Sequence, residues 1–204
     1  WAKYNGLYHH GERIVLSYSV GTGRVLESPW AEKAAGSVVF SRSFEIRGLK
    51  NSESILLAQS PQGGGVGQVR EVKGVNMSIV PRSKKSGDAT VIAATVLGDG
   101  NSIGVDGHRA IAKVKAGNSQ FTILLWEGPE KELESFALYA KKKFASPELV
   151  KWMKGGPKKW AETLDTKGEL GIAKKGEPYT LDTIQPPFDN PWGAILHFGG
   201  HDFF

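Results

Sequence analysis

Five histidines are the first candidates for metal binding or proton transfer in this chain of 204 residues. His9 and His10 are adjacent near its beginning, and His201 lies beside Asp202 near its end. Two histidines and an aspartate form a ligand set that zinc and other transition metals accept. Adjacent strand residues point to opposite faces, so only one of His9 and His10 could join such a site. Surface or capping roles are more common for such histidines, and we predict no metal here.

The six tryptophans are a second group with a chemical use, because indole rings pack in cores and also stack on flat ligands such as sugar rings. Trp1, Trp30 and Trp192 flank predicted loops, where they could meet a sugar. The other three lie on predicted strand or helix segments, and we expect most of the tryptophans to be packed inside. The candidate ligand-binding residues are His9, His10, Trp192, His201 and Asp202.

Several patterns resemble catalytic or nucleotide sites but lack a required residue. The glycine run at 63–67 has no Gly-Lys-Ser/Thr ending, and Arg70 replaces the third glycine of a dinucleotide fingerprint. The run 99–106 begins like a calcium loop, but Ile103 and Ala110 occupy its fifth and twelfth ligand positions. No Gly-x-Ser-x-Gly elbow occurs, and nothing pairs the carboxylates that glycoside hydrolysis needs. We therefore assign no catalytic residue.

The composition excludes several classes of protein. A hydrophobic content of 40% argues against wholesale disorder, and no apolar run approaches the roughly 20 residues that cross a bilayer. The absence of cysteine excludes disulfides, thiol catalysis and covalent haem attachment within this chain. The net charge of +5 is modest, and the triplet Lys141–Lys143 suits a helix end. We expect no membrane span, no cofactor and no nucleic-acid partner.

The first 127 residues predict a mainly β, antiparallel sandwich or barrel-like module. Apolar and polar residues alternate with period two in Arg13–Val20 and Val38–Arg47, which is typical of half-buried strands. We expect the alternate residues to be buried, with Arg42 at an edge or beside a partner. The inward residues would be Ile14, Leu16, Tyr18, Phe40, Phe44 and Ile46. Further predicted strands are Ser54–Gln59, Val75–Val80, Thr90–Leu97, Arg109–Ala116 and Gln120–Trp126.

Residues 128–164 predict a helical hairpin that packs on this module. Glu130–Phe144 has an apolar stripe at helical spacing, with acidic residues at its beginning and lysines at its end. Pro147–Lys154 begins after a capping serine and ends at a Gly-Gly-Pro sequence, and Lys158–Leu164 predicts one more helical turn. Residues 165–204 predict a polar loop and an extended tail, because Pro186-Pro187 and Asn190-Pro191 disfavour a helix.

Both ends of the chain resemble one family. The stretches are WAKYNGLYHHGERIVLSYSVG with VLESP, at residues 1–21 and 25–29, and YTLDTIQPPFDNPWG with FGGHDFF, at residues 179–193 and 198–204. They resemble large exported proteins of Planctomycetes and Verrucomicrobia, in which a domain of unknown function precedes a β-propeller and a c-type haem domain often follows. The middle of the chain, from about Asn51 to Gly128, resembles that family only loosely.

The resemblance implies a periplasmic or secreted location, with an export signal outside this sequence. It implies that the tail leads toward a propeller and that the adjacent propeller and haem domains are partners. The resulting hypothesis is a non-catalytic binding or interdomain module of an exported, often haem-linked protein, with carbohydrate as a further ligand. The alternative is part of a carbohydrate-active or sugar-dehydrogenase-type enzyme site, since members are often described as membrane-bound dehydrogenases.

Overall fold

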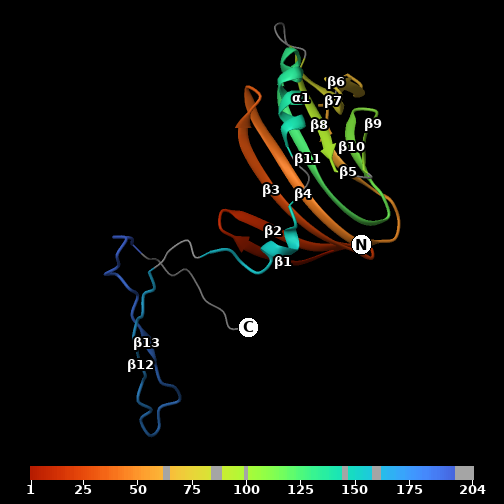
Figure 1. Cartoon of the computed structure of the whole chain (residues 1–204). Helices are drawn as coiled ribbons and strands as arrows, with labels where there is room; N and C mark the ends of the chain where they lie inside the picture. Colours follow the sequence, from red (N-terminus) through yellow and green to blue (C-terminus); the bar gives the residue numbers. More distant parts are fainter. Residues whose placement is uncertain (62–64, 84–88, 99–100, 144–146, 158–161, 196–204) are drawn as a thin grey trace. The chain divides into compact units, whose positions relative to one another are not determined.

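The computed structural model describes residues 1–61, 65–83, 89–98, 101–143, 147–157 and 162–195. Contacts divide the chain into two units, Trp1–Pro157 and Lys158–Phe204. The first unit is mainly antiparallel β structure, as predicted, and the sheets formed by its described residues do not close into a barrel (Figure 1).

The larger sheet of the first unit has eight strands in the order β1-β2-β3-β4-β11-β8-β7-β6, and all neighbouring pairs are antiparallel. Its strands are β1 (Ala2–His10), β2 (Arg13–Val20), β3 (Gly23–Ala34), β4 (Ser37–Leu49), β6 (Gln68–Val72), β7 (Val75–Ser83), β8 (Thr90–Leu97) and β11 (Gly117–Pro129).

A smaller sheet and the helices complete this unit. The smaller sheet has the order β5-β10-β9, with β5 (Glu53–Gln59), β10 (Arg109–Val114) and β9 (Ser102–Asp106). After β11, the 3-10 turn η1 (Glu130–Glu132) leads into α1 (Leu133–Lys142), and the short α2 (Leu149–Trp152) follows.

The larger sheet is buried on both faces in its middle. Ile123 and Leu124 are adjacent on β11 and almost fully buried, yet they belong to different hydrophobic clusters. Because adjacent strand residues point to opposite faces, α1 covers the face of Leu124, here called the helical face. The smaller sheet contributes Ala112 and Val114 to the cluster of Ile123 on the opposite face.

Helix α1 is held to the sheet by aromatic packing. The Phe136 ring stacks on the Trp126 ring, with centroids 5.6 Å apart, and the Trp126 indole N–H donates to the Ala35 carbonyl at 3.1 Å. A Cβ on residue 128 would lie 2.3 Å from the Trp126 ring, so Gly128 leaves the space that this ring occupies. The predicted burial of Leu133, Phe136 and Ala140 is confirmed.

The burial predicted for the first two patterned strands is only partly correct. Phe44 and Ile46 are buried, but Phe40 is 54% exposed, and Ile14, Leu16 and Tyr18 are half-buried while Val15 is fully buried. The period-two argument assumed one buried face. In β4 the buried face changes along the strand, because Val39 packs in the α1 cluster and Phe44 in the smaller-sheet cluster.

Element boundaries also differ from those predicted. Strands β1, β6 and β9 were not predicted, although Ile103 and Val105 of β9 alternate with polar residues and glycine. The second helix is shorter than Pro147–Lys154, and the turn predicted at Lys158–Leu164 is absent from residues 162–164, while 158–161 lie outside the described residues. Phe144, the last residue of the predicted first helix, lies outside them too.

Arg42, which was expected at an edge or beside a partner, pairs with Glu27. The Arg42 Nε lies 2.6 Å from Glu27 Oε1, and the Tyr18 hydroxyl donates to Glu27 Oε2 at 2.8 Å. Glu27 is only 7% exposed, so its charge depends on these two groups. Burial, followed by the Glu27 charge, raises the pKa of Tyr18.

The second unit contains a short hairpin. Strands β12 (Gly168–Glu169) and β13 (Thr183–Ile184) pair over two residues each, and the Gly171 N–H donates to the Asp182 carboxylate at 2.8 Å. The rest of the described tail is without helix, as the prolines predict.

Replacing Phe136 with Ala should lower the free energy of unfolding by about 3–5 kcal/mol, because it removes a fully buried ring and leaves a cavity. Urea denaturation measures this loss. The matched control is Leu138→Ala, on the same helix and 51% exposed, which should cost less than about 1 kcal/mol. Equal losses in the two variants would contradict the packing described for α1.

Replacing Arg42 with Met should cost about 1–3 kcal/mol, since it leaves the buried Glu27 carboxylate without its cation. The double variant with Glu27→Gln should recover part of the loss, as no charge then stays unpaired. Arg82→Met is the control, because its Glu127 partner is exposed, and it should be nearly neutral. A double variant no more stable than Arg42→Met alone would argue against this account.

Candidate ligand-binding site

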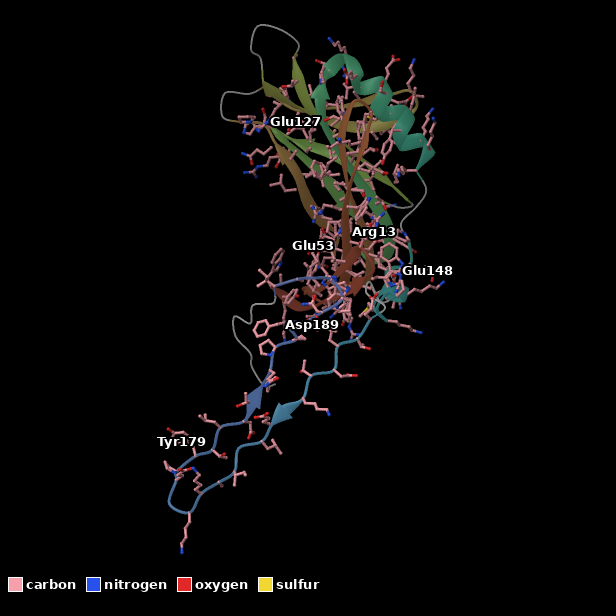
Figure 2. The ribbon with its side chains drawn as sticks, turned by 90° about the vertical axis from the view of Figure 1, so that its left-hand side faces the viewer. Arg13, Glu53, Glu127, Glu148, Tyr179 and Asp189 are labelled. Atoms are coloured by element: carbon pink, nitrogen blue, oxygen red, sulfur yellow. The ribbon has the colours of Figure 1, made fainter. Side chains whose placement is uncertain are left out.

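A cavity of about 130 Å³ lies on the helical face of the larger sheet, beyond the end of α1. Its floor comes from β2, β3, β4 and β11, and its walls from the end of α1 and from α2. Figure 2 shows Arg13, a lining residue from β2, in the same region as Glu148, which precedes α2. We call this cavity the Trp30 pocket.

Helix α2 is fixed over the sheet by a buried carboxylate. Glu45 is 8% exposed, and its Oε2 accepts the Val150 backbone N–H at 3.2 Å. Its Oε1 receives the Arg47 guanidinium at 2.6 Å. Leu149, the first residue of α2, is fully buried. Glu45 is on the face of β4 opposite to Phe44 and Ile46, which the alternation predicts to be the outward face, yet this residue is an anchor of the pocket wall.

His10 and His9 hold the chain that follows α2. The His10 ring stacks on Trp152 at a centroid distance of 5.5 Å, and its Nδ1 lies 3.0 Å from the Gly155 carbonyl oxygen. The Gly156 N–H donates to the His9 carbonyl at 3.2 Å. A Cβ on residue 156 would lie 2.3 Å from a backbone nitrogen, so only glycine allows this approach. His10 therefore positions Trp152 in the pocket wall.

Hydroxyl groups line the floor of the pocket. They belong to Ser28, Ser41, Ser43 and Thr122, and the Ser43 and Thr122 hydroxyls are 2.9 Å apart. Ser28 is only 2% exposed, and its Oγ has no hydrogen-bond partner among the described residues. Leaving a buried hydroxyl unsatisfied costs about 1–3 kcal/mol. A ligand oxygen that bonded to Ser28 would remove this cost.

Arg13 lies over Trp30, with its guanidinium carbon 3.7 Å from the ring centroid. Within the described part of the chain, this guanidinium forms no hydrogen bond or ion pair. Burial lowers the pKa of Arg13, while the charges of Glu32 and Glu12 act in the opposite direction. The pocket thus contains a partly desolvated cation whose N–H donors are not used by the described residues.

Three further lining residues form a connected group at the α1 side. Glu32 accepts hydrogen bonds from the Tyr139 hydroxyl and from the Lys143 ammonium, which lies 2.5 Å from Glu32 Oε1. These bonds lower the pKa of Glu32, and the bond from Lys143 has the larger effect. The bond to Glu32 raises the pKa of Lys143. The group ties β3 to the end of α1 and neutralises Lys143.

The structure does not bring the sequence-predicted site residues together. His9 is exposed and His10 half-buried on β1, and neither lines the Trp30 pocket. Trp192 lies in the second unit and is 41% exposed. Its backbone N–H donates to the Asn190 side-chain oxygen at 3.2 Å. His201 and Asp202 lie outside the described residues. The role of these residues in ligand binding stays a prediction.

The residues that do gather were missed because the sequence analysis predicted one buried face for β4 and no face for the strand around Trp30. Ser41 and Ser43 of β4 were expected to point outward, whereas both line the pocket. Ser28, Trp30 and Glu32 alternate along β3 and line it as well.

The described residues contain no group of three or more side chains placed to hold a metal ion. Among the helices that the structure describes, none has the length and apolar character needed to span a membrane.

Comparison with protein-family models gives a match at the beginning of the chain. Residues 1–27 match the model of a domain of unknown function, DUF6797. The matched stretch covers β1, β2 and the beginning of β3, and it includes Arg13. Neither the curated proteins nor the solved structures contain a match.

Replacing Glu32 with Gln should reduce stability at neutral pH and should matter less in acid. The folded pKa of Glu32 is lowered, so its stabilising effect is present above the unfolded value of about 4.3 and is lost as pH falls through the folded pKa. Thermal unfolding of both proteins between about pH 6 and pH 3 should show a shrinking difference. Glu71→Gln, an exposed change on β6, is the control. A difference that grows toward acid would contradict the described contacts.

Proposed function

We propose that this chain is a non-catalytic binding module of a larger exported protein, and that it binds a carbohydrate in the Trp30 pocket. The observation that carries the proposal is the buried, unpartnered Ser28 hydroxyl on a floor of other hydroxyl groups. Since nearly every buried polar group in a native protein has a partner, a ligand rich in hydroxyl groups fits this floor.

The aromatic side chains support the same ligand class. Trp30, Tyr139 and Trp152 line the pocket beside the hydroxyls, so it offers apolar ring surface together with donors and acceptors. Sugars present both kinds of surface, and pockets for small ligands combine them. Arg13 and His10 already occupy one face of Trp30 and Trp152, respectively. The ligand would therefore contact the other faces or the ring edges.

The absence of a suitable acid pair supports a binding role. Among the described residues that line the pocket, Glu32 is the one carboxylate, and it is engaged by Lys143 and Tyr139. Hydrolysis of a glycosidic bond needs two carboxyl groups placed across the bond. Turnover of a sugar by the purified chain would instead favour the alternative of a carbohydrate-active or dehydrogenase-type site.

The second unit supports an interdomain role. Its described residues include seven large apolar side chains that are each at least 70% accessible: Leu170, Ile172, Tyr179, Leu181, Ile184, Phe188 and Ile195. Tyr179 is labelled in Figure 2. An isolated two-stranded hairpin is marginally stable at best in water, and exposed apolar surface of this kind marks an interaction site. We propose that this unit docks on an adjacent propeller in a periplasmic or secreted, haem-linked parent protein.

Ser28→Ala should weaken sugar binding by about two- to tenfold, the value of one neutral hydrogen bond. The same change should leave stability unchanged or raise it slightly, because it removes an unsatisfied buried hydroxyl. Calorimetric titration with a panel of methyl glycosides measures binding, and thermal unfolding measures stability. The exposed Ser52→Ala is the matched control. Absence of binding to every glycoside in the panel would refute the carbohydrate proposal.

The chain should self-associate through its second unit at micromolar concentration. Ile172→Ser with Leu181→Ser should shift it toward monomer in sedimentation velocity, since both side chains are at least 75% exposed. Lys174→Ser with Glu177→Ser, in the same exposed segment, is the control and should leave association unchanged. If the unmodified chain were strictly monomeric, this result would argue against an apolar docking surface.

A further inference from the structure

We infer that the carbohydrate in the Trp30 pocket carries one oxyanion group, a carboxylate or a sulfate ester, and that Arg13 binds it. This inference rests on the proposed function, because it names the chemical class of ligand for the same pocket. It adds a charge requirement that sugar binding alone does not contain.

The geometry of Arg13 is that of a prepared anion receptor. Its guanidinium carbon lies over the Trp30 ring, 3.7 Å from the ring centroid, so the indole covers one side of the group. The N–H donors of a guanidinium lie in its plane and match two oxygens of a carboxylate or sulfate. Stacking on Trp30 restrains that plane while leaving the edge donors available to a ligand in the cavity.

Other half-buried arginines of this unit have anionic partners within the chain. Arg42 pairs with Glu27 at 2.6 Å, and Arg70 pairs with Glu130 at 3.1 Å. Arg13 makes no such pair with a described residue, although Glu12 and Glu32 are close enough to influence its pKa. A charge that is partly removed from water and unpaired is costly. A ligand anion would supply the missing partner.

The charges around the pocket leave room for one negative group. The charged lining residues are Arg13, Lys143 and Glu32, and since Lys143 pairs with Glu32 at 2.5 Å, the three together carry one net positive charge. A single carboxylate or sulfate ester balances it. The hydroxyls of Ser28 and Ser41 on the floor would bind the remaining oxygens of the sugar, which distinguishes the ligand from a free inorganic anion.

The experiment compares four probes by calorimetric titration at neutral pH: methyl glucoside, methyl glucuronide, glucose 6-sulfate and inorganic sulfate. We expect one of the two anionic sugars to bind at least about tenfold more tightly than methyl glucoside and than inorganic sulfate, as hydrogen bonds to charged groups are worth more than neutral ones. Its affinity should fall when salt rises from about 20 to about 200 mM, while that of methyl glucoside should not.

The variants assign the charge requirement to Arg13. Arg13→Gln should remove the preference for the anionic sugar and change methyl glucoside binding less than about threefold. Arg13→Lys should retain part of the preference, since it keeps the charge but loses the planar pair of donors. Arg109→Gln, on β10, is the matched control and should retain the full preference. If the Arg13 variants fail to fold, the salt dependence of the unmodified chain still decides the question.

The outcomes separate the two proposals. Equal, salt-independent binding of methyl glucoside and both anionic sugars would overturn the charge inference and leave the carbohydrate proposal standing. Binding of none of the three sugars would overturn the carbohydrate proposal, and this inference with it. A preference for the anionic sugar that survives Arg13→Gln in a folded protein would overturn the role of Arg13.

Discussion

The structure depends on the need to cover both faces of one long, curved antiparallel sheet. Ile123 and Leu124 are neighbours in the chain and both are inaccessible to water, which requires a separate layer on each side of β11. Helix α1 supplies one layer and the smaller sheet supplies the other. Neither layer extends over the whole sheet. The Trp30 pocket lies where α1 ends and where the strands change from apolar to hydroxyl residues on the helical face.

The wall that closes this region is held by polar contacts more than by apolar packing. Helix α2 is only four residues long, too short to be stable alone. Glu45 binds its backbone, and His10 binds both Trp152 and the following chain. Glu32 performs the equivalent task for the end of α1. The buried Glu45 thus has a positional role, whereas the Ser28 hydroxyl and the Arg13 guanidinium, which both line the pocket, form no hydrogen bond with a described residue.

Much of the architecture was predictable from sequence, and the site was not. Strands at Arg13–Val20 and Thr90–Leu97 and the apolar stripe of α1 were predicted from sequence, and the structure has these elements. An arginine on an apolar face predicted that Arg42 lies at an edge or beside a partner, and the structure has the partner, Glu27. Which face is buried depends on distant layers, so the predicted burial of Phe40 was wrong and that of Ile14 and Leu16 is only partial. The pocket combines four strands and two helices, and no single segment shows that its serines would meet Trp30 and Arg13.

The pairing of β11 with β4 sets the order in which the parts of the Trp30 pocket assemble during folding. Strands β1 to β4 are joined by short turns and pair in sequence order, so their contacts are local and can form early. The Ser43–Thr122 contact, in contrast, closes a separation of 79 residues. During synthesis, the serines and Arg13 leave the ribosome well before Thr122, α1 and α2 do. A nascent chain therefore carries half of a polar floor with nothing above it, and the Trp30 pocket is complete only when this long-range closure has formed.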